Sequence, residues 1–365
     1  MDFYRAIVRP LLFSCDAEWI HNRALDAGAA FGATQLGRTL LRGLFAYDDP
    51  CLHTDVAGLS FSNPLGLAAG FDKNGRSIRA LDALGFASVE VGSVSAHPSQ
   101  GNAKPRLFRL PEDEAIVVNY GVPNEGSQTV ARRVHNSGLN GLLGVNLVET
   151  NTGYALEGDA VVVEFVEAVR PFCGVADYIA LNLNCPNTTG GRSPFDDESL
   201  LYTLMLEYAR IEALPPVFLK FTAHAEGARM EAMLRAVEHC DFVRGFIFNL
   251  PPGTDYSLRS PASTVERMPG TLCGPPTQER MDAALRFWYR HIDRQRHAII
   301  GSGGVRTAED AYRKIRLGAS LVQLYTALVY RGPSLVGQIN RGLVDCLQRD
   351  GLRCISEAVG LDNGR

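Results

Sequence analysis

The segment Asn182-Leu-Asn-Cys185-Pro-Asn187 places one thiol between carboxamide side chains, directly after the apolar run Tyr178-Ile-Ala-Leu181. A thiol can remove a proton from a bound substrate, and carboxamides can hold a carbonyl compound without adding charge. No histidine lies nearby in the sequence to activate Cys185 as a nucleophile. The segment therefore favours oxidation of a C–C bond next to a carbonyl group over hydrolysis.

Two simpler interpretations of this segment stay open. Free cysteines are commonly small buried apolar residues, and asparagines such as Asn187 commonly cap turns. The proline and the polar loop after Cys185 favour the chemical role, and an ordinary thiol pKa of about 8.5 suits a base at neutral to mildly alkaline pH. The rest of the eight cysteines are scattered without a Cys-x-x-Cys pair, which indicates reduced thiols and no metal site.

Short apolar segments that alternate with amphipathic helix patterns must position these groups. Helix patterns include Asp159–Val169, Arg229–His239, Pro276–Tyr289 and Ala308–Leu317. We expect strands at Leu65–Ala69, Ser88–Gly92, Leu142–Leu147, Tyr178–Leu183, Val217–Phe221, Gly245–Leu250, Ala298–Gly301 and Ser320–Tyr325. This alternation predicts an α/β fold, a parallel (β/α)8 TIM barrel. An open doubly wound sheet is the alternative, but its Gly-x-Gly-x-x-Gly turn is missing after the first expected strand.

Residues 1–50 do not follow the strand–helix alternation. They predict an N-terminal helical extension with helices at Phe3–Ala30 and Gly37–Phe45, in front of a barrel domain at 51–365. Apolar side chains are interspersed with arginines along both helices. The extension is either a helical cap packed on the barrel or a helix pair on a membrane surface, with its basic residues toward lipid headgroups.

Active-site groups of such barrels gather at the carboxyl ends of the strands. After the first expected strand, Ala68, Ala69 and Gly70 would let a flat ring system lie on the backbone, and Lys73 follows. Near the ends of the later strands lie Ser93, Asn146, Asn182, Lys220, Asn249, Gly303, Gly304, Tyr325 and Thr326. The glycine pair and the two helix starts predict a phosphate site.

A neutral, amide-rich pocket with a phosphate site fits FMN. The cation of Lys220 would stabilise the anionic reduced flavin; alternatively, Lys220 is a barrel lysine held in a salt bridge. The net charge of −4 and the absence of a long basic run argue against a nucleic-acid partner. No stretch is apolar enough to span a membrane, and no secretory signal is present, so we expect a cytoplasmic protein.

Several motifs resemble the class 2 dihydroorotate dehydrogenases, which are membrane-associated, quinone-linked flavoenzymes. These motifs are Asn63-Pro-Leu-Gly-Leu-Ala-Ala-Gly-Phe-Asp-Lys-Asn74, Val91-Gly-Ser93, the segment Gly101–Asp113, and Gly318-Ala-Ser-Leu-Val-Gln-Leu-Tyr-Thr-Ala327. The resemblance implies a barrel that binds FMN, hydride transfer from the substrate to flavin N5 while a base takes a proton, and reoxidation of the flavin by a quinone. It also implies peripheral binding at the cytoplasmic side of the inner membrane.

The resemblance assigns roles to residues that match its motifs. The flavin contacts would include Lys73, Asn146, Asn182, Lys220, Cys273, Gly274, Gly303, Gly304, Tyr325 and Thr326. From the residues and the resemblance together, we expect Cys185 and Lys220 to be catalytic. We expect substrate contacts from Lys73, Asn119, Asn182, Asn187, Asn249 and Leu250. The quinone end would include His21, Arg109 and Tyr325.

Three positions depart from the class 2 pattern. Cys185 stands where class 2 enzymes usually carry serine and resembles the soluble class 1 enzymes. Val118 stands at the place of a substrate-binding asparagine, for which the adjacent Asn119 could substitute, and Leu250 replaces a hydroxyl residue. Each buried polar group of orotate left unpaired costs about 1–3 kcal/mol. We expect either dihydroorotate oxidation with quinone as acceptor or a diverged paralogue that oxidises or reduces another small carbonyl compound. A non-catalytic FMN-binding protein and a sugar-phosphate lyase or isomerase are the remaining alternatives.

Overall fold

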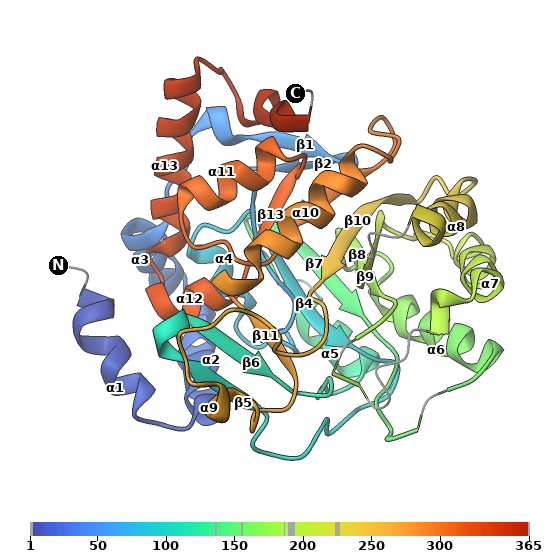
Figure 1. Cartoon of the computed structure of the whole chain (residues 1–365), viewed down its shortest axis with the longest axis horizontal. Coiled ribbons are helices and arrows are strands. Elements are labelled where there is room, and N and C mark those ends of the chain that lie inside the picture. The colour runs from blue at the N-terminus through green and yellow to red at the C-terminus, as the bar shows by residue number, and fades with distance from the viewer. Residues whose placement is uncertain are drawn as a thin grey trace.

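Eight parallel strands close into a barrel in the computed structural model, which describes residues 3–135, 137–154, 156–185, 187–188, 194–222 and 227–363. Their order around the barrel is β10-β12-β13-β3-β4-β7-β8-β9, with helices on the outside (Figure 1). They are β3 (Leu65–Leu67), β4 (Ser88–Val94), β7 (Leu142–Leu147), β8 (Tyr178–Asn182), β9 (Val217–Thr222), β10 (Val243–Asn249), β12 (Ala298–Gly301) and β13 (Leu321–Leu324). The predicted (β/α)8 TIM barrel is therefore confirmed.

The helices lie between the strands, as the amphipathic patterns predicted. The four expected helices are observed as α6 (Asp159–Val169), α8 (Gly227–Val237), α10 (Gln278–Tyr289) and α11 (Ala308–Arg316). The others are α4 (Ile78–Ala83), α5 (Ser127–Val134), α7 (Glu198–Tyr208), α9 (Ala262–Val265), α12 (Thr326–Arg331) and α13 (Leu335–Asp350). Helix α11 begins where expected because Thr307 and Asp310 form a capping box.

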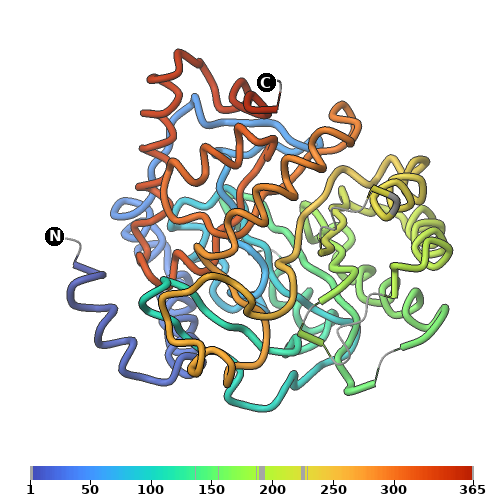
Figure 2. Tube along the Cα trace, viewed as in Figure 1, coloured from blue at the N-terminus to red at the C-terminus, as the bar shows by residue number. Residues whose placement is uncertain are grey.

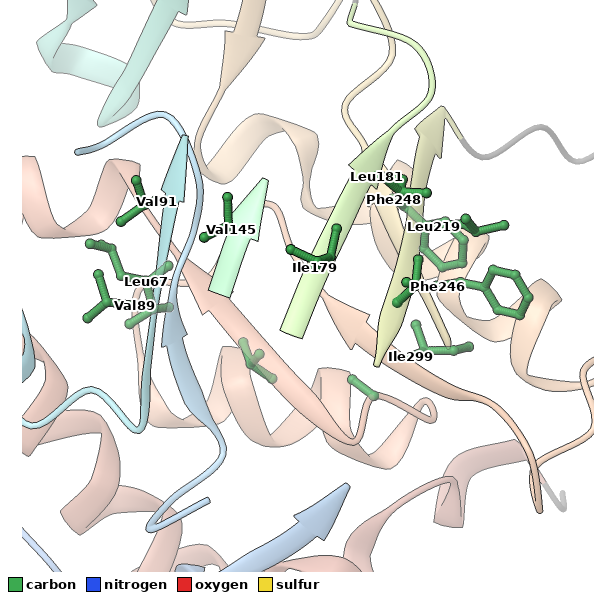
Figure 3. Packing of buried hydrophobic residues seen from close by; sticks show 14 of the residues in the cluster. Leu67, Val89, Val91, Val145, Ile179, Leu181, Leu219, Phe246, Phe248 and Ile299 are labelled. Carbon is green, nitrogen blue, oxygen red and sulfur yellow. The ribbon is translucent and has the colours of Figure 1, made fainter. Parts of the chain in front are cut away.

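Side chains alternate between the two faces of each strand, because successive residues of a strand point in opposite directions. Val89, Val145, Ile179 and Leu219 belong to the apolar layer between the barrel and its helices (Figure 3). The inward positions form a separate apolar plug that includes Tyr178, Ala180, Phe218, Ile247, Ile300 and Leu321. A hairpin of β1 (Thr54–Val56) and β2 (Leu59–Phe61) contributes Val56 and Phe61 to this plug. One end of the barrel is thus filled with apolar side chains.

A small antiparallel sheet, which the sequence did not predict, adds to the barrel. It consists of β5 (Leu107–Leu110), β6 (Ala115–Val118) and β11 (Thr271–Cys273), in the order β11-β6-β5. Val118 pairs with Leu107 on one side and with Thr271 on the other. Segments more than 150 residues apart in the chain therefore meet here, which explains why local sequence patterns did not reveal the sheet.

The N-terminal extension forms helices α1 (Arg9–Phe13), α2 (Ala17–Ala33) and α3 (Gln35–Phe45), after a π-helical turn at Tyr4–Val8. The expected first helix is broken before α2, where the Asp16 side chain caps the new helix by accepting from the Trp19 N–H. Figure 2 shows this segment along one side of the molecule. Among the helices of the described residues, none has both the length and the apolar character required to cross a bilayer.

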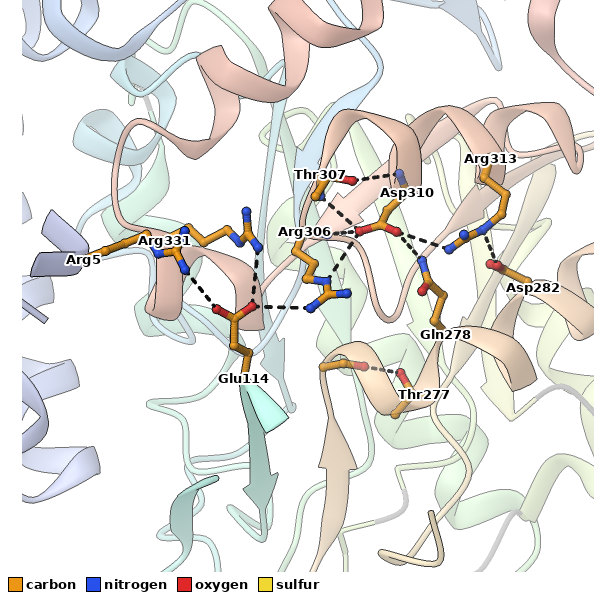
Figure 4. A network of polar contacts seen from close by, with 11 residues as sticks. Arg5, Glu114, Thr277, Gln278, Asp282, Arg306, Thr307, Asp310, Arg313 and Arg331 are labelled. Carbon is orange, nitrogen blue, oxygen red and sulfur yellow. Dashed lines mark hydrogen bonds and ion pairs between the residues drawn. The ribbon is translucent and has the colours of Figure 1, made fainter. Parts of the chain in front are cut away.

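Charged side chains join α10 and α11, which flank the loop that carries Gly303 and Gly304. Lys314 is fully buried, and its Nζ lies 2.6 Å from Asp282 Oδ1. Asp282 also accepts from Arg313, and Gln278 donates to Asp310 (Figure 4). Because burial of a cation is costly without a counter-ion, Asp282 makes the burial of Lys314 tolerable.

We expect Asp282→Ala to lower the free energy of unfolding by about 3–5 kcal/mol, because it leaves the Lys314 ammonium buried without its partner. The measurement is urea denaturation followed by circular dichroism. Asp255→Ala is the control, since Asp255 is exposed and its ion pair with Arg280 is long, at 3.9 Å. Equal destabilisation by the two substitutions would contradict this account.

Candidate active site

A pocket with an empty volume of about 1320 Å³ opens at the carboxyl ends of the barrel strands, beside the small antiparallel sheet. Most of the residues that the sequence singled out line it together. They are Ala68, Ala69, Gly70, Lys73, Ser93, Asn182, Cys185, Asn187, Lys220, Asn249, Leu250, Cys273, Gly274, Gly303, Gly304, Tyr325 and Thr326. Residues spread over some 260 positions of the chain therefore converge on one cavity, as a barrel with its site at the strand ends requires.

Two of the expected flavin and substrate residues do not line this pocket. Asn146 is fully buried below Ser93, whose hydroxyl donates to Asn146 Oδ1 over 2.5 Å. Asn119 turns its side chain to Asn102, whose Nδ2 donates to Asn119 Oδ1 over 3.0 Å. Strand alternation presents Val118 to the pocket instead. The expectation that Asn119 replaces a substrate-binding asparagine is therefore not supported by the geometry.

A buried carboxylate lies directly behind the pocket wall, in contact with Lys220 and Gln323. Glu90 has no exposed surface, and its Oε1 lies 3.6 Å from Lys220 Nζ and accepts from Asn146 Nδ2 over 2.9 Å. Its Oε2 accepts from Gln323 Nε2 over 2.5 Å and from the Tyr178 hydroxyl over 3.2 Å. Lys220 is therefore both a salt-bridged barrel lysine and a residue of the pocket wall.

Two of these residues, Glu90 and Gln323, were not among those that the sequence patterns indicated, although a signal was present. Both stand at inward positions of otherwise apolar strands, where a polar side chain must find a partner inside the barrel. Glu90 alternates with the outward residues Val89 and Val91, and Gln323 alternates with Val322 and Leu324. Both can be identified from the sequence by marking which residues of each strand point into the barrel.

The carboxamides of the site hold one another in defined orientations. Asn249 Nδ2 donates to Asn182 Oδ1 and to the Asn184 carbonyl oxygen, each over 2.7 Å. Asn187 Oδ1 accepts from the Thr271 hydroxyl over 3.2 Å. Asn187 therefore has its amide N–H groups left for a ligand, whereas Asn249 has its carbonyl oxygen left.

Cys185 lies in the pocket wall at the end of β8. Burial raises the pKa of its thiol above the ordinary value, and the backbone N–H of Asn187 and the positive charge of Lys220 offset part of this rise. Cys185 can therefore accept a proton from a ligand, with a thiolate fraction that increases with pH. It is a weaker base at neutral pH than an exposed thiol would suggest.

Lys73 is a second cation in the pocket. Burial lowers the pKa of its ammonium group to about 8. Its Nζ donates to the Gly70 carbonyl oxygen over 2.7 Å and lies 3.7 Å from the centroid of the Tyr120 ring. A cation held in this way can hydrogen-bond a carbonyl or carboxylate group of a bound ligand.

The pocket fits a flat, phosphorylated ring system. Gly303 and Gly304 follow β12 with positive φ angles, and a Cβ atom on Gly304 would lie 2.5 Å from Gln278 Cβ. Only glycine can occupy this turn without a shift of its neighbours. Deeper in the pocket, Gln323 Oε1 is buried without a hydrogen-bond partner among the described residues. An N–H group of a bound ring would satisfy it.

Next to the glycine loop, the Glu114 carboxylate lies between three guanidinium groups. Its distances to Arg331, Arg306 and Arg5 are 3.5, 3.6 and 3.7 Å (Figure 4). Arg306 and Glu114 both line the pocket, and Arg5 comes from the N-terminal helical turn. The surplus of positive charge suits a phosphate group at this end of the pocket.

A second, mostly apolar pocket of about 1330 Å³ empty volume lies between the N-terminal helices and the barrel. His21, Arg109 and Tyr325 all line it, and Tyr325 lines the first pocket as well. Phe71 packs edge-on against both His21 and Tyr325. The sequence-based grouping of His21, Arg109 and Tyr325 thus corresponds to one cavity that adjoins the active-site pocket.

The polar groups of the second pocket are held by the protein itself. His21 Nε2 lies 2.7 Å from the Phe71 carbonyl oxygen, and burial lowers the pKa of the ring to about 4. His21 is therefore neutral at physiological pH. Arg109 donates to the carbonyl oxygens of Leu12 and Cys15 and lies over the Phe13 ring. The cavity favours a neutral apolar ligand with a few polar atoms.

Comparisons with known proteins agree with this geometry. The chain is 38% identical over 361 residues to the dihydroorotate dehydrogenase (quinone) of Roseiflexus sp. strain RS-1, and 36% identical over 362 residues to that of Natronomonas pharaonis, with 98% of each chain covered. The crystal structure of DHODH from Eimeria tenella in complex with ferulenol superposes with a TM-score of 0.80 at 27% identity, covering 96% of each chain. Residues 51–347 match the model of the dihydroorotate dehydrogenase family, and the chain belongs to that family.

Proposed function

We propose that this protein oxidises dihydroorotate to orotate with FMN as its cofactor and a quinone as the electron acceptor. The observation that carries the proposal is the convergence of Cys185, Lys220 and the oriented asparagines on one pocket that adjoins an apolar second pocket through Tyr325. We infer the substrate and the acceptor from the related enzymes, which are named dihydroorotate dehydrogenase (quinone).

FMN would be held by Ala68–Gly70 along its ring, by Lys220 and Gln323 at its polar edge, and by Gly303, Gly304 and Thr326 at its phosphate. When bound, it takes a hydride from the substrate. Cys185 takes the proton of the neighbouring carbon, and Asn187, Asn249 and Lys73 hold the carbonyl and carboxylate groups. Asn146 lies outside the pocket and would orient the hydroxyl of Ser93, which lines it.

A second candidate is the same chemistry on a less polar carbonyl compound, in the oxidising or the reducing direction. The observation in its favour is that Val118 and Leu250 both line the pocket. A ligand with polar atoms at both places would leave them unpaired, at about 1–3 kcal/mol each.

Anaerobic addition of dihydroorotate to the purified, FMN-loaded protein distinguishes the two candidates. Under the first candidate, the absorbance of the oxidised flavin bleaches and orotate forms in equal amount. If the flavin stays oxidised with dihydroorotate but is reduced by dithionite, the first candidate fails and the second gains support. Protein that binds no FMN would overturn both.

We expect the rate of flavin reduction by dihydroorotate to rise with pH and to level off above the raised pKa of Cys185, because only the thiolate accepts a proton. Cys185→Ala should lower this rate by roughly 10²- to 10⁴-fold and remove the pH dependence. Stopped-flow absorbance measures both. Cys354→Ser, which changes a thiol outside the pocket, serves as the control. An unchanged rate in Cys185→Ala would refute its role as the base.

The second pocket is the proposed quinone site, formed by the N-terminal segment at 1–50 against the barrel domain at 51–365. We expect Ala24→Trp to fill part of this pocket and to raise the KM for a short-chain quinone roughly tenfold. Flavin reduction by dihydroorotate should stay within about twofold of wild type, since Ala24 is remote from the first pocket. Ala30→Trp, on the same helix but outside the pocket, is the control. Equal losses in both half-reactions would contradict a separate quinone site.

We also propose that the N-terminal helices bind peripherally to a membrane, at the cytoplasmic side of the inner membrane. Large apolar side chains are exposed along them: Phe3, Ile7, Leu11, Trp19, Phe31, Leu36, Leu40 and Leu44. Leu36, Leu40 and Leu44 share one face of α3, and Arg38 and Arg42 lie on the same helix. Phe31 also lines the second pocket, so that pocket lies at the proposed membrane face.

Co-sedimentation with anionic lipid vesicles tests this proposal. Leu40→Glu should weaken vesicle binding roughly tenfold, because it removes apolar area from the bilayer contact. Val163→Glu makes the same charge change at an exposed apolar position of α6 and should bind as wild type does. Equal weakening in both variants would show a charge effect without insertion of the helix.

A further inference from the structure

We infer that Glu90, which does not line the pocket, is the positioning residue that sets the hydrogen-bond polarity of the active site and balances the charge of Lys220. The inference rests on the proposed function, because it concerns a pocket that holds a flavin. Glu90 has no exposed surface and four neighbouring donors: Asn146, Gln323, Tyr178 and Lys220.

Glu90 acts as the hydrogen-bond acceptor of its layer. Among the described residues, Asn146 Nδ2, Gln323 Nε2 and Lys220 Nζ can only donate to its two oxygens, and the Tyr178 hydroxyl also donates in this arrangement. The Glu90 carboxylate accepts from all of them. Glu90 is therefore the fixed acceptor of this layer, and the orientation of each neighbouring amide follows from it.

Glu90 orients the asparagines that face the ligand through Asn146 and Ser93. Asn146 must turn its Nδ2 to Glu90, which leaves Asn146 Oδ1 to accept from the Ser93 hydroxyl. The Ser93 oxygen then accepts from Asn182 Nδ2 over 3.5 Å, and Asn182 Oδ1 accepts from Asn249 Nδ2 over 2.7 Å. Because Asn249 gives its amide hydrogens to Asn182 and Asn184, its carbonyl oxygen is the group that can meet a ligand.

Glu90 also orients Gln323, in this case by a direct hydrogen bond. Its Nε2 donates to Glu90, and its Oε1 is buried in the pocket wall without a partner among the described residues. The wall therefore offers the acceptors Gln323 Oε1 and Asn249 Oδ1 beside the donors Lys220 and Asn187. Such a wall selects ligands whose edges alternate N–H and C=O groups, which is the pattern of an imide or a ureide.

Glu90 also has an electrostatic effect. The Lys220 ammonium group reaches both Glu90 and the pocket, and it keeps only 12% of its side-chain surface exposed. The Glu90 carboxylate neutralises part of its field. Removal of the negative charge would leave Lys220 uncompensated in a low-dielectric site, where it would favour an electron-rich, reduced flavin.

Glu90→Gln tests the inference, because glutamine keeps the shape but can donate as well as accept. In the FMN-loaded protein we expect a more positive flavin midpoint potential, corresponding to roughly tenfold tighter binding of reduced over oxidised flavin. The Kd for dihydroorotate in anaerobic titrations should rise roughly 10- to 100-fold, since the amide chain can reverse. A structural role alone would not shift the potential in this direction.

Asp82→Asn is the matched control. Asp82 is also a buried carboxylate, but it accepts from Asn140 and Gly141 just before β7, at the opposite end of the barrel. Its neutralisation should leave the flavin potential and the Kd for dihydroorotate unchanged. A potential that shifts equally in both variants would overturn the inference.

Ser93→Ala keeps the inference testable if Glu90→Gln does not fold. It interrupts the chain between Asn182 and Asn146 but leaves the Glu90–Lys220 pair intact. The Kd for dihydroorotate should rise roughly tenfold, because Asn182 loses the Ser93 oxygen as its acceptor. An unchanged Kd would overturn the inference that Glu90 orients the asparagines through Ser93. If wild-type protein bound no flavin, the proposed function would fail together with the inference, whereas a wild-type potential in Glu90→Gln would overturn the inference alone.

Discussion

A carboxylate buried inside a closed barrel must be surrounded by hydrogen-bond donors, because an unpaired charge in that environment would cost several kcal/mol. Glu90 imposes this requirement on the barrel of this protein. The apolar plug around Tyr178 and Phe218 fills the barrel on one side of Glu90, and the pocket opens on the other. The polar layer of Glu90, Asn146, Lys220 and Gln323 thus separates the stabilising core from the chemical site. Asn182 and Asn249 are linked to this layer through Ser93.

The two pockets depend on each other through a few aromatic and charged contacts. Tyr325 lines both, and Phe71 packs between Tyr325 and His21. Beside the glycine loop, Glu114 forms ion pairs with arginines from that loop, from α12 and from the N-terminal turn. The N-terminal helices are therefore part of the active-site assembly, and their exposed apolar faces remain available for a membrane surface.

The pocket combines polar groups suited to catalysis with two apolar side chains. In the proposed reaction, Cys185 is the base, Lys220 is the cation and the oriented asparagines are neutral hydrogen-bonding groups, which suits oxidation next to a carbonyl group. Val118 and Leu250 line the same pocket without polar atoms. Family membership and the polar groups of the pocket thus both favour flavin-dependent oxidation. Val118 and Leu250 affect only how polar the neighbouring part of the substrate can be.

The sequence by itself predicted the barrel, because strand and helix periodicity is a local property, and it predicted the site residues that end strands or form glycine turns. Cys185, Lys220 and the Gly303-Gly304 pair belong to this group. The tertiary structure decided what depends on partners far apart in the chain: the sheet of β5, β6 and β11, the turning of Asn119 toward Asn102, and the pairing of Glu90 with Lys220 and Gln323. Glu90 and Gln323 are separated by 233 positions, and only closure of the barrel brings their side chains together. A sequence pattern names the residue types available for chemistry, whereas the direction of each hydrogen bond follows from which side chains the fold places next to a buried charge.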